Sequence, residues 1–225
     1  MDLQKKKERL LNYYKHSKTA KSKEVIDAFM RVPREEFVRP NQRNQAYDDH
    51  PLPIGHGQTI SAPHMAFIMC DLLELKEGDK VLEVGAGSGY HAAICAAMVA
   101  PPDSQNPGHV YTIERIPKLA EFAKKNLAKS GFSDLVTVII GDGTLGYPEK
   151  APYEAILVTA AGPKVPDPLV EQLSVGGKLI IPVGGRMMYQ DLVLVERVKP
   201  DKVVRKKMGG VAFVPLIGEH GWEGK

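Results

Sequence analysis

One glycine-rich turn constrains the fold of this chain more than any other feature. The apolar run Val81–Val84 is followed by glycines at three alternate positions, Gly85, Gly87 and Gly89, and then by the helix-forming run Ala92–Val99. This pattern predicts a buried strand, a tight turn and a helix. Glycine tolerates positive φ and lets a ligand approach the backbone, and a helix N-terminus offers free N–H groups and a positive dipole. The turn therefore predicts a ligand site, the alternative being a strand–helix turn without a ligand.

The spacing of the glycines separates two kinds of ligand. The dinucleotide fingerprint G-x-G-x-x-G/A needs a small residue at position 90, where this chain has Tyr90. The order Glu83-x-Gly85-x-Gly87-x-Gly89 instead resembles the first motif of methyltransferases that use S-adenosylmethionine. That resemblance implies that these four residues take part in cofactor binding.

Strand-like and helix-like segments alternate around this turn. We expect parallel strands at 80–84, 109–113, 135–140, 153–158 and 177–183, and helices at 90–99, 117–129 and 166–173. Runs with apolar residues on both faces, such as Val136-Thr137-Val138-Ile139-Ile140, are typical of strands buried on both faces of a parallel sheet. Two alternating runs, 191–198 and 211–216, suit antiparallel edge strands. The pattern predicts an α/β three-layer sandwich with a mostly parallel, Rossmann-like, seven-stranded sheet.

The chain is expected to form a single domain over residues 1–225. Residues 1–31 predict two helices with a polar break, residues 40–63 predict a loop, and a further helix begins at Pro63 and ends at Gly78. Within the domain we expect N-terminal helices and an active-site loop at 1–77, a cofactor-binding core at 78–185, and substrate-side strands at 186–225.

Two acidic residues follow the next two predicted strands. Ligands of open α/β sheets bind beyond the carboxyl ends of the strands. Glu114 there is suited to accept hydrogen bonds from both ribose hydroxyls, the alternative being a solvated carboxylate. Asp142, between Gly141 and Gly143, suits a pocket for the adenine amino group, the alternative being an Asx turn. Their order along the chain favours the cofactor interpretation.

Segments beyond the glycine turn resemble the protein-L-isoaspartate (D-aspartate) O-methyltransferase family. Residues 53–65, Pro-Ile-Gly-x-Gly-Gln-Thr-Ile-Ser-Ala-Pro-His-Met, resemble the segment that precedes the first strand of that family. Residues 141–153 resemble its second motif, 158–161 follow in the same register, and 211–216 resemble its C-terminal substrate-side strand. The resemblance extends from about residue 25 to 217.

The resemblance implies a class I methyltransferase fold and a protein-repair activity. The methyl group of S-adenosylmethionine would pass to the free α-carboxyl of L-isoaspartyl and D-aspartyl residues, leaving S-adenosylhomocysteine. The methyl ester then closes to a succinimide, which hydrolyses partly to normal aspartate. Because a carboxylate is already ionised at pH 7, the reaction needs orientation and exclusion of water rather than a general base.

The resemblance also assigns site residues. It implies a catalytic role for Ser61, whose hydroxyl would orient the carboxylate; the alternative is an N-cap of the Pro63 helix. The remaining cofactor residues it implies are Gln58, Thr59, Ile60, Ser61, Arg115 and Gly143. The substrate residues it implies are Ile54, Ser61, Ala160, Ala161, Val214 and Leu216, with the backbone of 160–161 pairing to the peptide. Residues 217–218 depart from the family pattern, so we assign them no cofactor role.

The composition limits the kinds of partner and ligand that we expect for this chain. A net charge of +3 is too small to indicate nucleic acid, and the basic runs 5–7 and 205–207 suit solvated faces. Cys70 and Cys95 predict buried free thiols. The spacing of the histidines predicts no metal site. With a polar N-terminus and no long apolar run, we expect a cytoplasmic monomer that acts on isoaspartyl peptides and on unfolded or flexible protein segments.

Other functions remain open from the sequence. The second hypothesis is a methyltransferase of the same fold that acts on RNA or a small molecule. A nucleotide-dependent oxidoreductase and a non-catalytic binding module are further alternatives. A serine hydrolase is disfavoured because Ala86 and Tyr90 stand where G-x-S-x-G around Ser88 requires glycine.

Overall fold

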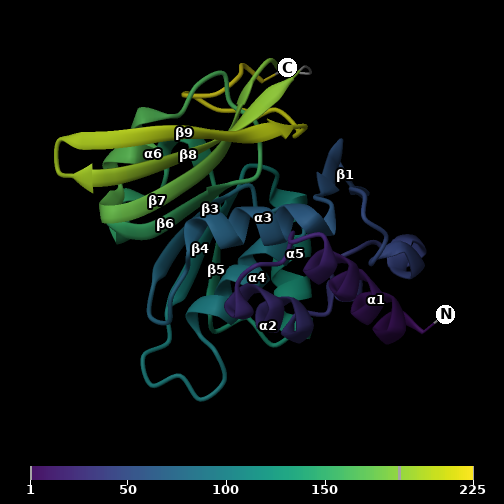
Figure 1. Ribbon diagram of the computed structural model, residues 1–225. Helices are drawn as coiled ribbons and strands as arrows, with labels where there is room; N and C mark the ends of the chain where they lie inside the picture. Colours follow the sequence, from purple (N-terminus) through teal and green to yellow (C-terminus); the bar gives the residue numbers. More distant parts are fainter. Residues whose placement is uncertain (1, 187–188, 225) are drawn as a thin grey trace.

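A twisted seven-stranded sheet forms the centre of the molecule (Figure 1). The computed structural model describes residues 2–186 and 189–224. The strand order is β5-β4-β3-β6-β7-β8-β9. The strands are β3 (Lys80–Val84), β4 (His109–Glu114), β5 (Val136–Ile140), β6 (Tyr153–Val158), β7 (Leu173–Gly184), β8 (Gln190–Lys199) and β9 (Lys202–Val211). The first five in the order are parallel, β8 is antiparallel to β7, and β9 is antiparallel to β8. The predicted mostly parallel seven-stranded sheet is confirmed.

Helices cover the two faces of the sheet unequally. One face carries α3 (Pro63–Leu73), α4 (Tyr90–Val99) and α5 (Pro117–Lys129), and outside them lie α1 (Leu3–His16) and α2 (Lys23–Arg31) (Figure 1). The other face carries the short helix α6 (Asp167–Glu171) and 3-10 turns at Gly143–Leu145 and Pro148–Lys150. Neighbouring residues of β3 point to opposite faces, since Val81 joins one apolar cluster and Leu82 the other.

Strand β3 lies inside the sheet, with other strands on both sides of it. β4 and β5 extend the sheet on one side of β3, and β6 and β7 extend it on the other. The switch point, where open α/β sheets bind ligands, therefore lies between the carboxyl ends of β3 and β6. The glycine turn stands at that point, because it follows β3 directly.

Several predicted boundaries are wrong. The expected loop at 40–63 contains a 3-10 segment, Pro40–Gln45, and a small two-stranded sheet of β1 (Leu52–Gly55) and β2 (Gln58–Ile60). Helix α3 ends at Leu73 rather than Gly78, because Glu74 adopts a left-handed conformation that stops it.

The C-terminal prediction also needs correction. The last strand is β9 (Lys202–Val211), not 211–216; it is an edge strand exposed along most of its length, so it lacks the apolar alternation of a half-buried strand. Residues 212–217 instead cross the carboxyl end of β6, where the Ala161 N–H donates to the Val214 carbonyl (2.8 Å). Strand β5 is the opposite edge and is not buried on both faces: Ile140 is 49% exposed.

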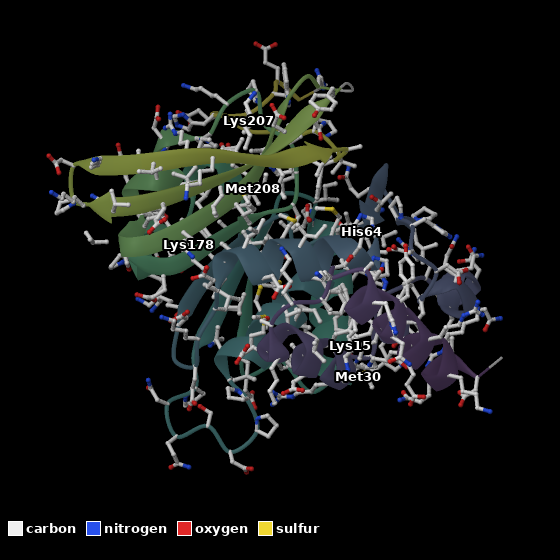
Figure 2. All side chains as sticks on the ribbon, viewed as in Figure 1. Lys15, Met30, His64, Lys178, Lys207 and Met208 are labelled. Atoms are coloured by element: carbon white, nitrogen blue, oxygen red, sulfur yellow. The ribbon has the colours of Figure 1, made fainter. Side chains whose placement is uncertain are left out.

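The two basic runs have different environments. Residues 205–207 lie exposed on β9, as predicted, and Figure 2 marks Lys207 there. Lys7 of the other run is buried, which corrects its prediction as part of a solvated face. Its ammonium donates to the carbonyls of Met30 and Val32 (both 3.0 Å), and burial lowers the pKa of Lys7 to about 8.

Across the described ranges, no helix is long and apolar enough to cross a bilayer.

Candidate cofactor and substrate site

The glycine turn has the backbone that its sequence predicts. Gly85, Gly87 and Gly89 all have positive φ (99°, 54° and 86°), a region that side chains disfavour. A Cβ on Gly85 would also lie 2.5 Å from the Thr159 hydroxyl. The turn is held from below, because the Gly85 and Ala86 N–H groups donate to one carbonyl of β4 (2.8 and 3.1 Å). These contacts leave the outer face of the turn open to a ligand.

Glu114 holds the same turn from the side. One carboxylate oxygen accepts the Gly87 N–H and the other accepts the Ile116 N–H, both at 2.9 Å. The residue is 6% exposed and lines the pocket beyond β3, β4 and β6. A carboxylate has about four acceptor sites, so two remain for hydroxyl groups of a ligand. The geometry fits the ribose contact predicted for Glu114.

Asp142 forms the turn that was its alternative prediction. One carboxylate oxygen accepts from the backbone (2.8 Å) and hydroxyl (2.7 Å) of Thr144. The other accepts the Glu219 N–H at 2.7 Å, which ties the C-terminal segment to this strand end. Gly143 lines the pocket, but Asp142 is not among the residues that do. The Asx turn is confirmed, and the adenine contact stays a prediction.

The pocket brings together most of the predicted cofactor residues. Its lining includes Gln58, Thr59, Gly85, Gly87, Glu114, Arg115 and Gly143. Sequence reasoning missed Val84, Ile113, Thr159, Pro215 and Ile217, which complete it. Val84 and Ile113 end or nearly end their strands, so strand position was an available signal for both. Ile217 lines the pocket although no role was assigned to it, because only the tertiary path of residues 212–217 brings it there.

Ser61 lies where two hollows meet. It lines a groove of about 960 Å³ that runs to β8 and β9, and it also lines a small hollow beneath the glycine turn. The N-cap of α3 is Ala62, which makes no side-chain cap bond, so the alternative role of Ser61 as a helix cap is wrong. Thr59 lines both hollows and the cofactor pocket. The three spaces therefore border one another around Thr59.

Two predicted substrate contacts are contradicted. The Ala161 N–H donates to the Val214 carbonyl, and the Ala161 carbonyl accepts the Leu216 N–H (2.8 Å each). The backbone of Ala161 is thus paired within the chain and is not available to a peptide. Ile54 is fully buried, and its Cδ1 lies against Gly87, so it supports the glycine turn instead of lining the groove.

The other predicted substrate residues divide between the two spaces. Val214 lines both the groove and the cofactor pocket, whereas Ala160 and Leu216 line only the cofactor pocket. His64, at the start of α3 (Figure 2), lines the groove, and its Nδ1 lies 2.8 Å from the Asp49 carboxylate. Burial raises the pKa of Asp49, but the contacts with His64 and Tyr14 together outweigh burial, so the pKa is lower than usual.

Three predicted cofactor residues lie beneath or beside the turn rather than in the main pocket. Glu83 and Ile60 line the small hollow, and Gly89 packs against α5. Glu83 is 1% exposed and accepts a hydrogen bond from the Thr112 hydroxyl. Burial, aided by the charge of Glu114 and opposed by Thr112, raises the pKa of Glu83 to about 8.

In the part of the chain that the structure describes, no three His, Cys, Asp or Glu side chains gather as metal ligands.

Known proteins with similar sequences decide the family. The protein-L-isoaspartate(D-aspartate) O-methyltransferase family matches residues 5–221 of this chain. The chain belongs to this family. It is 57% identical to a protein-L-isoaspartate O-methyltransferase of Hyperthermus butylicus, over 90% of this chain and 84% of the relative. It is 56% identical to the enzyme of that name from Staphylothermus marinus, over 96% and 95% of the two chains.

Solved structures agree with this protein-L-isoaspartate O-methyltransferase assignment. A putative protein-L-isoaspartate O-methyltransferase of Plasmodium falciparum, in complex with S-adenosyl-L-homocysteine, superposes with a TM-score of 0.82. The two chains are 27% identical over 93% of this chain and 97% of that one. The predicted family, fold, enzyme class and cofactor are confirmed, and the oxidoreductase and non-catalytic alternatives are set aside.

Proposed function

We propose that this chain repairs damaged proteins by methylating the free α-carboxyl of L-isoaspartyl and D-aspartyl residues. Membership of the family supports the reaction. The observation that carries the assignment of residues is the position of Ser61, which lies at the junction between the groove and the glycine turn and serves no helix cap. A hydroxyl at that junction can reach a substrate carboxylate that faces the cofactor pocket.

The residues of the pocket fit S-adenosylmethionine. When bound, this cofactor supplies a methyl group that its positive sulfur has already activated. We propose that Glu114 binds the two ribose hydroxyls through its remaining acceptor sites, and that Val84 and Ile113 form an apolar wall. Gly85 and Gly87 line the pocket with backbone alone, and a Cβ on Gly85 would meet the Thr159 hydroxyl. Thr59, common to all three hollows, lies beside the path between cofactor and substrate.

The chemistry asks the protein for orientation and for a dry site. An α-carboxyl group with an ordinary pKa of about 3.5 is ionised at neutral pH, so no side chain needs to remove a proton. Ser61 donates its hydroxyl proton in a hydrogen bond to one carboxylate oxygen and leaves the other free to attack. Residues 214–217 line the pocket from above and exclude water from the nucleophile.

The groove suits an extended peptide, not a folded surface. It is open along Gly210, Val211 and Phe213 and reaches back to His64. Flexible or unfolded segments that carry isoaspartate are therefore the proposed substrates, taken by a single cytoplasmic chain. We propose one functional unit, in which residues 1–77 supply the Ser61 loop, 78–185 the cofactor core and 186–225 the outer wall of the groove.

The decisive experiment uses two peptides that differ only in one linkage. The purified protein is incubated with methyl-labelled S-adenosylmethionine and either an isoaspartyl peptide or its aspartyl twin. We expect label on the isoaspartyl peptide alone, in a form that mild base releases as methanol, since a methyl ester is base-labile and an N-methyl group is not. A base-stable product, or equal labelling of both peptides, would contradict the proposal.

A further inference from the structure

Arg34 is a fully buried arginine next to the active-site segment. It lies in the 3-10 turn Arg34–Glu36 and is 0% exposed. Its Nε donates to the Ala46 carbonyl (2.8 Å), and one terminal nitrogen donates to the Ser61 carbonyl (2.6 Å). Its guanidinium carbon lies 4.7 Å from the centre of the Tyr90 ring. One planar group therefore contacts three separate parts of the chain.

Two of those parts, Ser61 and Tyr90, line the site. Ser61 lies at the junction of the groove and the small hollow beneath the glycine turn. Ala46 precedes the small two-stranded sheet, β1 and β2, that leads to Ser61. Tyr90 is the first residue of α4, directly after the glycine turn. Arg34 thus connects the segment that carries Ser61 with the element that begins the cofactor turn.

Packing alone does not account for a guanidinium at this position. None of the ion pairs among the described residues includes Arg34, and one of its terminal nitrogens has no hydrogen-bond partner there. A buried cation without a counter-ion is costly, and an apolar side chain of similar size is often as stable. Burial lowers the pKa of Arg34, and burial together with this positive charge lowers the pKa of His91 to about 3.

We propose that Arg34 is a positioning residue for methyl transfer, which fixes the Ser61 hydroxyl relative to the cofactor turn by clamping the Ser61 carbonyl against Tyr90. Arginine suits this task because its fork is rigid and planar, donates in two directions and stacks on an aromatic ring. Lysine carries the same charge but lacks the fork. The proposal rests on the role proposed above for Ser61.

Arg31 provides a matched control within the same segment. It also donates to a backbone carbonyl, that of Ala100 (2.7 Å), and its guanidinium also lies over a ring, that of Phe132 (5.2 Å). Ala100 follows the far end of α4, away from the glycine turn. Arg31 is exposed whereas Arg34 is buried, so Arg31→Met removes a similar but solvent-exposed carbonyl-and-ring contact that does not touch the site.

The test measures kcat, KM for the isoaspartyl peptide, affinity for S-adenosylhomocysteine and melting temperature for Arg34→Lys, Arg34→Met and Arg31→Met. Misplacement of a reacting group by ~1 Å costs about 100-fold in rate, so we expect kcat of Arg34→Lys to fall by about 10- to 100-fold with KM and cofactor affinity little changed. Arg31→Met should melt earlier but keep the native kcat. A native kcat in Arg34→Lys would contradict the proposed positioning role of Arg34. If Arg34→Met does not fold, Arg34→Lys alone tests that role.

A double-mutant cycle with Ser61→Ala tests whether Arg34 acts through Ser61. If it does, Arg34→Lys should cost much less when the hydroxyl is already absent, because the two changes remove one interaction. Equal costs in both backgrounds would contradict the inference, as would a Ser61→Ala variant with native kcat. Methylation of the isoaspartyl peptide by the native protein is measured first, so a failure of the proposed function is seen separately from a failure of the clamp.

Discussion

Replacing Glu114 by alanine tests two roles of this residue, which are to hold the glycine turn and to bind the cofactor. In the protein alone, the carboxylate accepts the Gly87 and Ile116 N–H groups at 2.9 Å each. In the complex with cofactor, it is proposed to accept two ribose hydroxyls as well. Glu114→Ala removes all four acceptor contacts without adding bulk, since alanine is smaller than the side chain it replaces.

The two roles have separable magnitudes. Hydrogen bonds to a charged group are worth about 1.5–3 kcal/mol each, but the two freed N–H groups border a pocket and can bond to water, so we expect a total loss of stability of about 2–3 kcal/mol. For a chain of this size that corresponds to roughly 4–12 °C in melting temperature. The lost ribose contacts weaken cofactor binding by a further 1.5–3 kcal/mol, roughly 10- to 100-fold. Without Glu114 the glycine turn must also become ordered when the cofactor binds, so we expect a loss of affinity of about 100-fold.

Calorimetry with S-adenosylhomocysteine and a thermal melt on the same sample measure both effects. Glu154→Ala is the control, because Glu154 of β6 also accepts a backbone N–H, that of Lys80 (2.9 Å), at the opposite end of the sheet. It should lower the melting temperature slightly and leave the affinity at the native value. A folded Glu114→Ala protein that binds S-adenosylhomocysteine as tightly as the native one would refute the ribose contact.

Three further predictions follow from individual residues. Ser61→Ala should keep the native melting temperature, since Ser61 caps no helix, and should lower turnover by at most about 10²–10³-fold, the loss known for one oxyanion donor; a normal turnover number would remove Ser61 from the reaction. Burial raises the pKa of Glu83 to about 8, so the folded state keeps a proton that the unfolded chain has lost, and stability falls as pH rises between about 4.5 and 8 by up to about 1.4 kcal/mol per pH unit. Glu83→Gln should therefore melt above the native protein at pH 8, and melting curves that stay offset equally at pH 4.5 would contradict this. Gly85→Ala should destroy cofactor binding because its Cβ meets Thr159, whereas Gly176→Ala, with φ of 86° and open space around it, should cost only about 1–2 kcal/mol and leave affinity intact.

The cofactor side could be predicted from the sequence because local rules determine it. Gly85 and Gly87 need positive φ, and that need is visible in the residue type alone. Glu114 and Gly143 follow strands whose apolar runs are plain in the sequence, and parallel strands place their carboxyl ends at one edge of the sheet. Knowing the strands was therefore enough to bring these residues together.

The substrate side could not be predicted in the same way, because long-range contacts build it. The pairing of Ala161 with Val214 and Leu216 joins residues more than fifty positions apart and leaves no local signal. Strand β9 was missed because an exposed edge strand needs no apolar alternation. Arg34 gave no sequence signal, since a single arginine in a polar stretch predicts a solvated side chain.

The two sides of the site therefore differ in how the protein makes them rigid. Glu114 and the glycine turn are fixed by β3 and β4, which are buried inside the sheet, so their geometry survives most changes elsewhere. Ser61 lies between a two-stranded sheet and a helix that lacks a side-chain cap, and neither element alone fixes its position. A hydroxyl that must orient a carboxylate needs the same precision as the cofactor pocket. The buried guanidinium of Arg34, which holds the Ser61 carbonyl and stacks on Tyr90, couples this loop to the rigid core and supplies that precision.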